Sequence, residues 1–180
     1  MHLSWYVSNQ LELYLYSKYV LELELSKSTL ALGAYDKGRL VGFLFAQFKN
    51  EPKVWTSWPQ QLFLKAADKI IDWAGYRDTS DVYDQANQEM LANFTPQQPD
   101  GELTFFAVDP RLTGKKIGTR LLARLEEMKR GQLIYLYTDS GSTYQFYLRR
   151  GFEVFEQREL ELPTATGKVP LTCFLMSRKL

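Results

Sequence analysis

Cysteine and histidine are nearly absent from this chain, since each occurs once in 180 residues. Cys173 lies in an apolar run, so we expect it to fill the core, with no internal disulfide and no thiolate metal site. His2 lies at the start of the chain, so a Ser-His-Asp or Cys-His mechanism has no credible base and zinc catalysis lacks its usual ligands. We therefore expect no metal, and any chemistry must use carboxylates, tyrosines, lysines or the backbone.

Long apolar runs are also missing, and none approaches the length that spans a membrane. The N-terminal region carries Glu12, Glu22 and Glu24 and does not resemble a signal peptide. We expect a cytoplasmic protein with no membrane partner. The hydrophobic fraction of 45% is typical of a globular chain, and the length predicts one domain over residues 1–180. The absence of repeats and of basic aromatic stretches argues against nucleic-acid binding.

A Gly- and Lys-rich turn joins a strand-like segment to an amphipathic helix. Residues 103–108 are apolar, aromatic and β-branched, as in a buried strand, and apolar residues recur at helical spacing from Ile117 to Met128. The turn between them presents backbone N–H groups and the positive end of a helix dipole. It predicts a polyphosphate site. Its charge comes from four cations: Arg111, Lys115, Lys116 and Arg120.

A second element follows about thirty residues later. Residues 133–138 are typical of another strand, and residues 142–150 of a short helix that Gly151 closes in the usual position after the last turn. Phe152 then leads into a further strand.

At these residues the chain resembles the GNAT superfamily of CoA-dependent N-acyltransferases. Residues 108–122 are similar to its pyrophosphate-binding motif A and residues 146–152 to its motif B; the resemblance covers residues 29–48 and 102–180. Thr113 stands where the family has Arg or Gln, and Lys116 stands at the central Gly, where a missing Cβ lets the backbone approach the pyrophosphate. Ser140 replaces a frequent Asn.

The resemblance implies an α/β fold with a mixed central sheet flanked by helices. It also implies an acyltransferase in which a primary amine directly attacks acetyl-CoA, the acyl-donor substrate. In the family, the motif A strand parts from its neighbour near Val108 and leaves backbone groups for the pantetheine arm and the thioester carbonyl. The cofactor-binding residues it implies are Phe106, Ala107, Val108, Thr113, Gly114, Lys115, Lys116, Ile117, Gly118, Thr119 and Ser140.

Three residues are candidates for catalysis. By resemblance, the motif B tyrosine is Tyr147, whose hydroxyl would protonate the departing thiolate or hydrogen-bond to it. Glu102 has a place similar to that of the glutamate base in the histone-acetyltransferase branch. Asp139, at the carboxyl end of the next strand, is the rival base or an anchor for the amine.

Elsewhere, residues 30–35 and 39–48 flank Asp36-Lys37-Gly38 and predict a β-hairpin. Residues 4–27 alternate like strands, whereas their Leu and Glu content suits a helix; the resemblance favours helix and leaves the family's usual first strand missing. Residues 49–101 are too long for a bare loop, so we expect an insertion with helices over 59–74 and 80–94.

Charge is divided along the chain. Residues 55–100 hold seven acids and three bases, while residues 103–150 hold nine bases and four acids. A basic half suits CoA phosphates, and an acidic insertion favours a small cationic amine as acceptor.

Two other functions stay open. Thr113 and Lys116 are compatible with a catalytically inactive acyl-CoA-binding regulatory protein. Alternatively, Trp55, Trp58 and Trp73 could dock a protein partner. A homodimer is compatible with the aromatic content.

Overall fold

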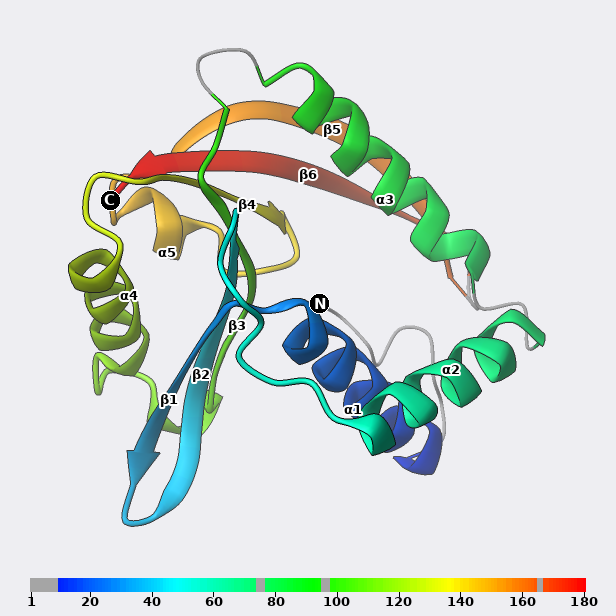
Figure 1. Cartoon of the computed structure of the whole chain (residues 1–180). Coiled ribbons are helices and arrows are strands. Elements are labelled where there is room, and N and C mark those ends of the chain that lie inside the picture. The colour runs from blue at the N-terminus through cyan, green and yellow to red at the C-terminus, as the bar shows by residue number, and fades with distance from the viewer. Residues whose placement is uncertain (1–9, 74–76, 95–97, 165–166) are drawn as a thin grey trace.

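A six-stranded mixed sheet with the order β1-β2-β3-β4-β6-β5 forms the centre of the protein (Figure 1). The computed structural model describes residues 10–73, 77–94, 98–164 and 167–180. Among the described strands, β3 and β4 pair in parallel and every other neighbouring pair is antiparallel. The strands are β1 (Leu30–Asp36), β2 (Arg39–Phe48), β3 (Gly101–Val108), β4 (Leu133–Asp139), β5 (Glu153–Thr164) and β6 (Gly167–Lys179).

Helices lie on both faces of this sheet. They are α1 (Gln10–Lys27), α2 (Trp58–Trp73), α3 (Arg77–Ala92), α4 (Ile117–Met128) and α5 (Gln145–Leu148), with a 3₁₀ turn, η2, at Pro110–Leu112. In Figure 1, α4 and α5 lie together, whereas α3 runs along β5 and β6. The expected α/β architecture, a mixed sheet flanked by helices with a helical insertion before β3, is confirmed.

Alternate residues of β4 show that α3 and α4 cover opposite faces. Ile134 and Leu136 belong to the larger core cluster, which also contains Leu121, Leu122 and Leu125 of α4. Tyr135 and Tyr137 instead pack against a smaller cluster around Met90 of α3 and Cys173, Leu171 and Leu175 of β6. Since successive strand side chains point to opposite faces, the two clusters are separated by the sheet.

The predicted hairpin is confirmed. β1 and β2 pair antiparallel around a turn in which Lys37 and Gly38 both have positive φ, 49° and 78°, as a tight two-residue hairpin turn requires. Cys173 is fully buried, so its expected role in the core is confirmed. His2 and the position of the family's usual first strand lie outside the described residues.

The Leu- and Glu-rich segment forms the helix α1. This helix packs on α2 through polar contacts: the Tyr19 hydroxyl donates to Asp68 over 2.6 Å, and Gln60 Nε2 donates to Glu22 over 2.9 Å. Val20 is buried, whereas Leu11 and Tyr14 are both 63% exposed. The polar contacts with α2, a further contact with β2 and the exposure of apolar side chains such as Leu11 account for the absence of a clean helical period in the sequence of α1.

The other helices follow the predictions with shifted ends. Both insertion helices are present; α2 fits the predicted range within one residue, and α3 begins three residues before the predicted start. The helix predicted over 142–150 is reduced to α5, because turns occupy the residues on either side. In the described part of the chain, no helix is both long and apolar enough to cross a membrane.

Close packing at Gly101 gives a test of the sheet. A Cβ on Gly101 would lie 2.8 Å from the Gln47 carbonyl oxygen and 2.5 Å from a Phe48 ring carbon. We expect Gly101→Ala to lower the free energy of unfolding by about 2 kcal/mol, because β2 must move. Gly33→Ala is the matched control: its Cβ meets only the side chains of exposed Tyr35 and Leu40, so urea unfolding should show little change. An equal loss of unfolding free energy in both variants would contradict the close packing inferred at Gly101.

Candidate functional site

The two parallel strands separate soon after they meet. β3 and β4 pair only at Gly101 with Ile134 and at Glu102 with Tyr135, although both strands continue for several residues. β3 stays paired with β2 as far as Val108, and β4 stays paired with β6 as far as Asp139. Each strand therefore keeps its outer partner, and the edges that face each other are left without a sheet partner. We call this opening the strand split.

A β-bulge in β3 lies at the closed end of the strand split. Phe105 is opposite Phe45, but Leu103 is opposite Ala46, so Thr104 is an extra residue. The bulge turns Phe106 toward the α4 face while Phe105 packs on Phe43 of the opposite face, with ring centroids 5.3 Å apart. The sequence carries no signal for this bulge, which re-aims the backbone of β3 along the strand split.

Asp109 holds the turn that leaves β3. Its Oδ1 accepts hydrogen bonds from the backbone N–H and Nε of Arg111 at 3.0 and 2.9 Å, and its Oδ2 accepts one from Nη2 of Arg111 at 2.7 Å. Arg39 of β2 adds a contact at 3.7 Å. These hydrogen bonds, with the Arg111 charge, lower the pKa of Asp109 to about 2. The carboxylate therefore stays charged and caps η2 at neutral pH.

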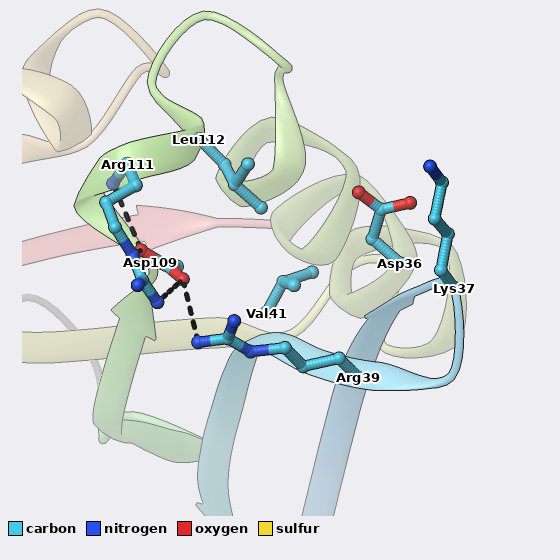
Figure 2. Close-up of a pocket in the computed structure, with 7 residues that line it drawn as sticks. All are labelled: Asp36, Lys37, Arg39, Val41, Asp109, Arg111 and Leu112. Atoms are coloured by element: carbon cyan, nitrogen blue, oxygen red, sulfur yellow. Dashed lines mark hydrogen bonds and ion pairs between the residues drawn. The ribbon is translucent and has the colours of Figure 1, made fainter.

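An open hollow of about 340 Å³ lies on the hairpin side of this turn (Figure 2). Figure 2 shows Arg39 and Arg111 meeting at Asp109, with the hairpin tip opposite. Because β2 and β4 flank opposite edges of β3, the hollow and the strand split are on different sides of that strand. Its lining residues are Asp36, Lys37, Arg39, Val41, Asp109, Arg111 and Leu112.

The N-terminus of α4 presents free backbone donors beside the strand split. Gly114 has a φ of 89° with open space around its Cα, and Lys116 adopts the left-handed conformation, with φ 57° and ψ 23°. No side chain caps the helix at Lys116. The N–H groups of Ile117, Gly118 and Thr119 fall in the first turn, where a helix offers them no internal acceptor.

The four cations of the turn divide into two pairs. Arg111 is bound to Asp109, and Lys115 Nζ lies 3.4 Å from Asp36 of the hairpin. Lys116 and Arg120 make no ion pair with any described residue, and both are exposed. These two side chains are therefore the ones available to a bound anion. The Thr113 hydroxyl donates to the Pro110 carbonyl at 2.7 Å, within the turn itself.

Motif B packs directly on the first turn of α4. A Cβ on Gly118 would lie 3.1 Å from the Phe146 ring, so the missing side chain at this position serves helix packing. The guanidinium of Arg150 stacks on Phe146 at 3.6 Å and donates to the Thr119 hydroxyl and the Phe146 carbonyl. The anion-binding turn and α5 therefore form one packed unit.

Tyr147 is held among aromatic rings near the strand split. Its ring centroid lies 6.3 Å from that of Phe106 on β3, 5.3 Å from Phe146 and 5.6 Å from Phe152. Burial raises the pKa of Tyr147 to about 12, so the hydroxyl is protonated at neutral pH and can donate.

Glu102 lies at the closed end of the strand split. The hydroxyl of Tyr135 on β4 donates to its Oε2 over 2.8 Å. Burial raises the pKa of this carboxyl, against the opposing effect of the Tyr135 hydrogen bond. The structure therefore places a carboxylate with enhanced basicity between the two strands.

Asp139 and Ser140 lie at the other end of β4, where the strand split is open. Asp139 is 8% exposed, and its Oδ1 accepts no hydrogen bond within the described residues. Ser140 is engaged by β6: its backbone N–H donates to the Thr172 carbonyl at 2.8 Å, and its Oγ accepts from the Thr172 N–H at 3.1 Å.

Comparison with known proteins identifies the family to which this chain belongs. The model of the acetyltransferase (GNAT) family matches residues 3–152. The chain belongs to the GNAT acetyltransferase family. This family uses acetyl-CoA, so membership indicates an acyltransferase. The comparison with curated proteins gave no match.

One solved structure with a TM-score above 0.5 supports the GNAT fold, and others are similar at lower scores. The first is a Corynebacterium glutamicum protein named histone acetyltransferase HPA2 and related acetyltransferase, with a TM-score of 0.55, 17% identity, and coverage of 99% of this chain and 81% of that one. A ribosomal-protein-alanine N-acetyltransferase from Brucella melitensis has a TM-score of 0.49 and 16% identity, over 93% and 78% of the two chains. Arabidopsis thaliana Naa50, in complex with the bisubstrate analogue CoA-Ac-MVNAL, has a TM-score of 0.47 and 14% identity, over 96% and 82%.

The residues predicted for the GNAT site fall in three places. Residues 106–108 lie on the part of β3 that borders the strand split, and residues 113–119 form the turn and first helical turn next to it. Glu102 and Asp139 lie at opposite ends of the strand split, with Tyr147 on the α4 face. Sequence reasoning missed Tyr135 and Asp109, although the position of Asp109 directly before Pro110 is a common capping signal.

The left-handed residue Lys116 gives a test of the GNAT turn. A non-glycine side chain in this conformation is strained, and the family's central Gly removes that strain. We expect Lys116→Gly to leave the free energy of unfolding unchanged or raise it by up to about 1 kcal/mol. Lys115→Gly, one residue earlier, should lower it by about 0.5–1 kcal/mol, since Lys115 has no positive φ to relieve. A clear loss of stability in Lys116→Gly, measured by urea unfolding, would contradict this account.

Proposed function

We propose that this protein transfers an acetyl group from acetyl-CoA to a primary amine by direct attack of the amine on the thioester. The observation that carries the proposal is the strand split, which opens toward the end of β3 that leads to α4. It leaves strand-edge backbone groups next to a helix N-terminus with unused donors. An extended thioester with a pyrophosphate needs both features together.

Acetyl-CoA, the acetyl donor, would be bound by residues on both sides of the turn between β3 and α4. The N–H groups of Ile117, Gly118 and Thr119 would bind the pyrophosphate, with Lys116 and Arg120 adding positive charge. The open space at Gly114 lets the backbone approach the phosphates. The β4-facing backbone edge of residues 106–108 would pair with the pantetheine arm. Bound acetyl-CoA supplies the activated acetyl group and a thiol leaving group.

Catalysis then needs three groups of the protein. A β3 backbone N–H, aimed at the thioester carbonyl, stabilises the negative charge that develops on its oxygen. Glu102, held by Tyr135, removes the proton of the attacking nitrogen through water. As the C–N bond forms and the C–S bond breaks, Tyr147 donates a hydrogen bond or a proton to the sulfur.

A screen of primary amines tests the proposal. Turnover is followed by release of the free CoA thiol, and the acetylated amine is identified by mass spectrometry. The proposal predicts an N-acetylated product from at least one amine. Tight CoA binding without any turnover would favour a regulatory acyl-CoA-binding protein. No CoA binding at all would favour an interaction module, for which Trp55 and Trp58, 56% and 75% exposed, are the available aromatics; the Trp73 side chain lies outside the described residues.

Replacement of Tyr147 tests its role toward the sulfur. Tyr147→Phe keeps the ring contacts and removes the hydroxyl, so we expect kcat at saturating acetyl-CoA to fall by roughly 10²-fold. CoA affinity by calorimetry should be retained. Tyr144→Phe is the control, since Tyr144 stacks on Phe174 and is not among the rings that pair with Tyr147 in the described residues. Wild-type kcat in folded Tyr147→Phe would make Tyr147 a packing residue.

Glu102 should set the acidic limb of the pH profile. The base must be ionised, so kcat/KM should fall as pH drops through a pKa above the ordinary glutamate range. A raised folded pKa stabilises the protein only at low pH, where the carboxyl is protonated, and ionisation at neutral pH opposes folding. Glu102→Gln should therefore keep its Tm at pH 7 while kcat falls at least tenfold. An unchanged acidic limb in this variant would exclude Glu102 as the base.

A further inference from the structure

An unpartnered carboxylate oxygen is buried beneath α3. Asp139 is 8% exposed, its Oδ1 accepts no hydrogen bond within the described residues, and none of the ion pairs formed there includes it. A buried carboxylate is unfavourable unless a donor or a cation meets it. The described residues therefore supply no partner for this carboxylate oxygen.

Asn87 of α3 presents a second such oxygen at the same interface. It is 8% exposed, and its Oδ1 is also without a hydrogen-bond donor among the described residues. The hydroxyl of Tyr137 donates to the backbone carbonyl of Asn87 over 3.0 Å, which joins α3 to this part of β4. Asp139 follows Tyr137 by two residues, so the two side chains share one face of β4 about 7 Å apart.

Tyr83 connects the two positions. It lies one helical turn before Asn87, on the same side of α3. It packs against the buried cluster that contains Cys173, and Cys173 is opposite Asp139 in the β4–β6 pairing. Burial and the Asp139 charge raise the pKa of Cys173 to about 12, and burial raises that of Tyr83, so neither group adds a second negative charge. Asp139 is the one acidic group that this cluster of Tyr83, Asn87, Asp139 and Cys173 contains.

The chemistry of this cluster selects an ammonium group. Carbonyl and carboxylate oxygens are acceptors, an ammonium has three donors and one positive charge, and aromatic rings such as Tyr83 favour a cation nearby. No group of three or more metal-ligating side chains occurs among the described residues, so a bound metal ion is not indicated. An alkylammonium satisfies both the hydrogen-bonding and the charge requirement.

This ammonium differs from the nitrogen that is acetylated. A carboxylate next to an ammonium favours its charged form, and a charged nitrogen has no lone pair for attack. The base Glu102 contacts Tyr135, four residues before Asp139 on β4 and about 13 Å away along the strand. The strand split thus has a proton acceptor at its closed end and an anion at its open end.

We infer that the acceptor is a linear diamine or polyamine, whose second, charged nitrogen binds between Asp139 and Asn87 beneath α3. The inference rests on the proposed acetyl transfer and names its substrate class. The reacting amine is then neutral and free to attack, while the charged nitrogen fixes its position.

The experiment compares diamines with monoamines of the same length, from 1,3-diaminopropane to 1,8-diaminooctane and from propylamine to octylamine, with acetyl-CoA as donor. The wild type should show a KM for its best diamine at least tenfold below that of the matched monoamine. Asp139→Asn should raise the diamine KM by roughly 10- to 100-fold, which would remove most of the difference between the diamine and the matched monoamine. Without ligand, its Tm should not fall, because the carboxylate it loses has no partner.

Matched variants and a binding measurement complete the test. Asn87→Ala should weaken diamine binding, whereas Gln88→Ala, at the exposed neighbouring position of α3, should not. Diamines alone should raise the Tm of the wild type and not that of Asp139→Asn. Equal KM values for diamines and monoamines would overturn the inference and leave acetyl transfer intact. If no amine is acetylated, the proposed function fails, and the Tm shift then decides the ammonium site by itself: no shift overturns it.

Discussion

The early separation of β3 from β4 is the constraint on which the rest of this structure depends. Two parallel strands that pair at two positions and then part leave N–H and C=O groups that a sheet would otherwise satisfy. The outer pairs, β2 with β3 and β4 with β6, keep the strands in place on either side. The aromatic packing of Phe106 with Phe146 and Tyr147 supports β3 from the α4 face, beyond the last β3–β4 pair.

The same geometry links the donor and acceptor sides of the site. β3 continues through Asp109 and η2 to the N-terminus of α4, so the strand edge and the free helical donors are parts of one continuous segment. On the opposite face, α3 runs along β5 and β6 and is joined to β4 by the hydrogen bond from Tyr137, two residues before Asp139. Acetyl-CoA bound along the turn and an amine bound beneath α3 would thus meet in the strand split. Under the proposed function, the acidic insertion would contribute to acceptor binding through the placement of α3 as well as through its charge.

Local chemistry explains what could be read from the sequence. The hairpin around Gly38, the helix from Ile117 and the strand before Asp109 follow from turn residues and periodicity, and all three are confirmed, although residues 104–108 of the strand are only partly buried. Lys116 stands at the family's central Gly, but its left-handed backbone cannot be predicted from the sequence, because the surrounding fold holds the residue in this strained conformation. The bulge at Thr104, the bond between Tyr135 and Glu102, and the unpartnered oxygen of Asp139 depend on which strands and helices become neighbours. Periodicity carries no such information.

Hydrogen–deuterium exchange with and without acetyl-CoA tests the central claim most directly, because it reports on the backbone groups that the strand split exposes. The account predicts slower exchange on binding for the β4-facing amides of residues 105–108 and for Ile117, Gly118 and Thr119. Amides in β1 should be unchanged, since that strand lies beyond β2. Binding of acetyl-CoA that protects neither segment would contradict the account.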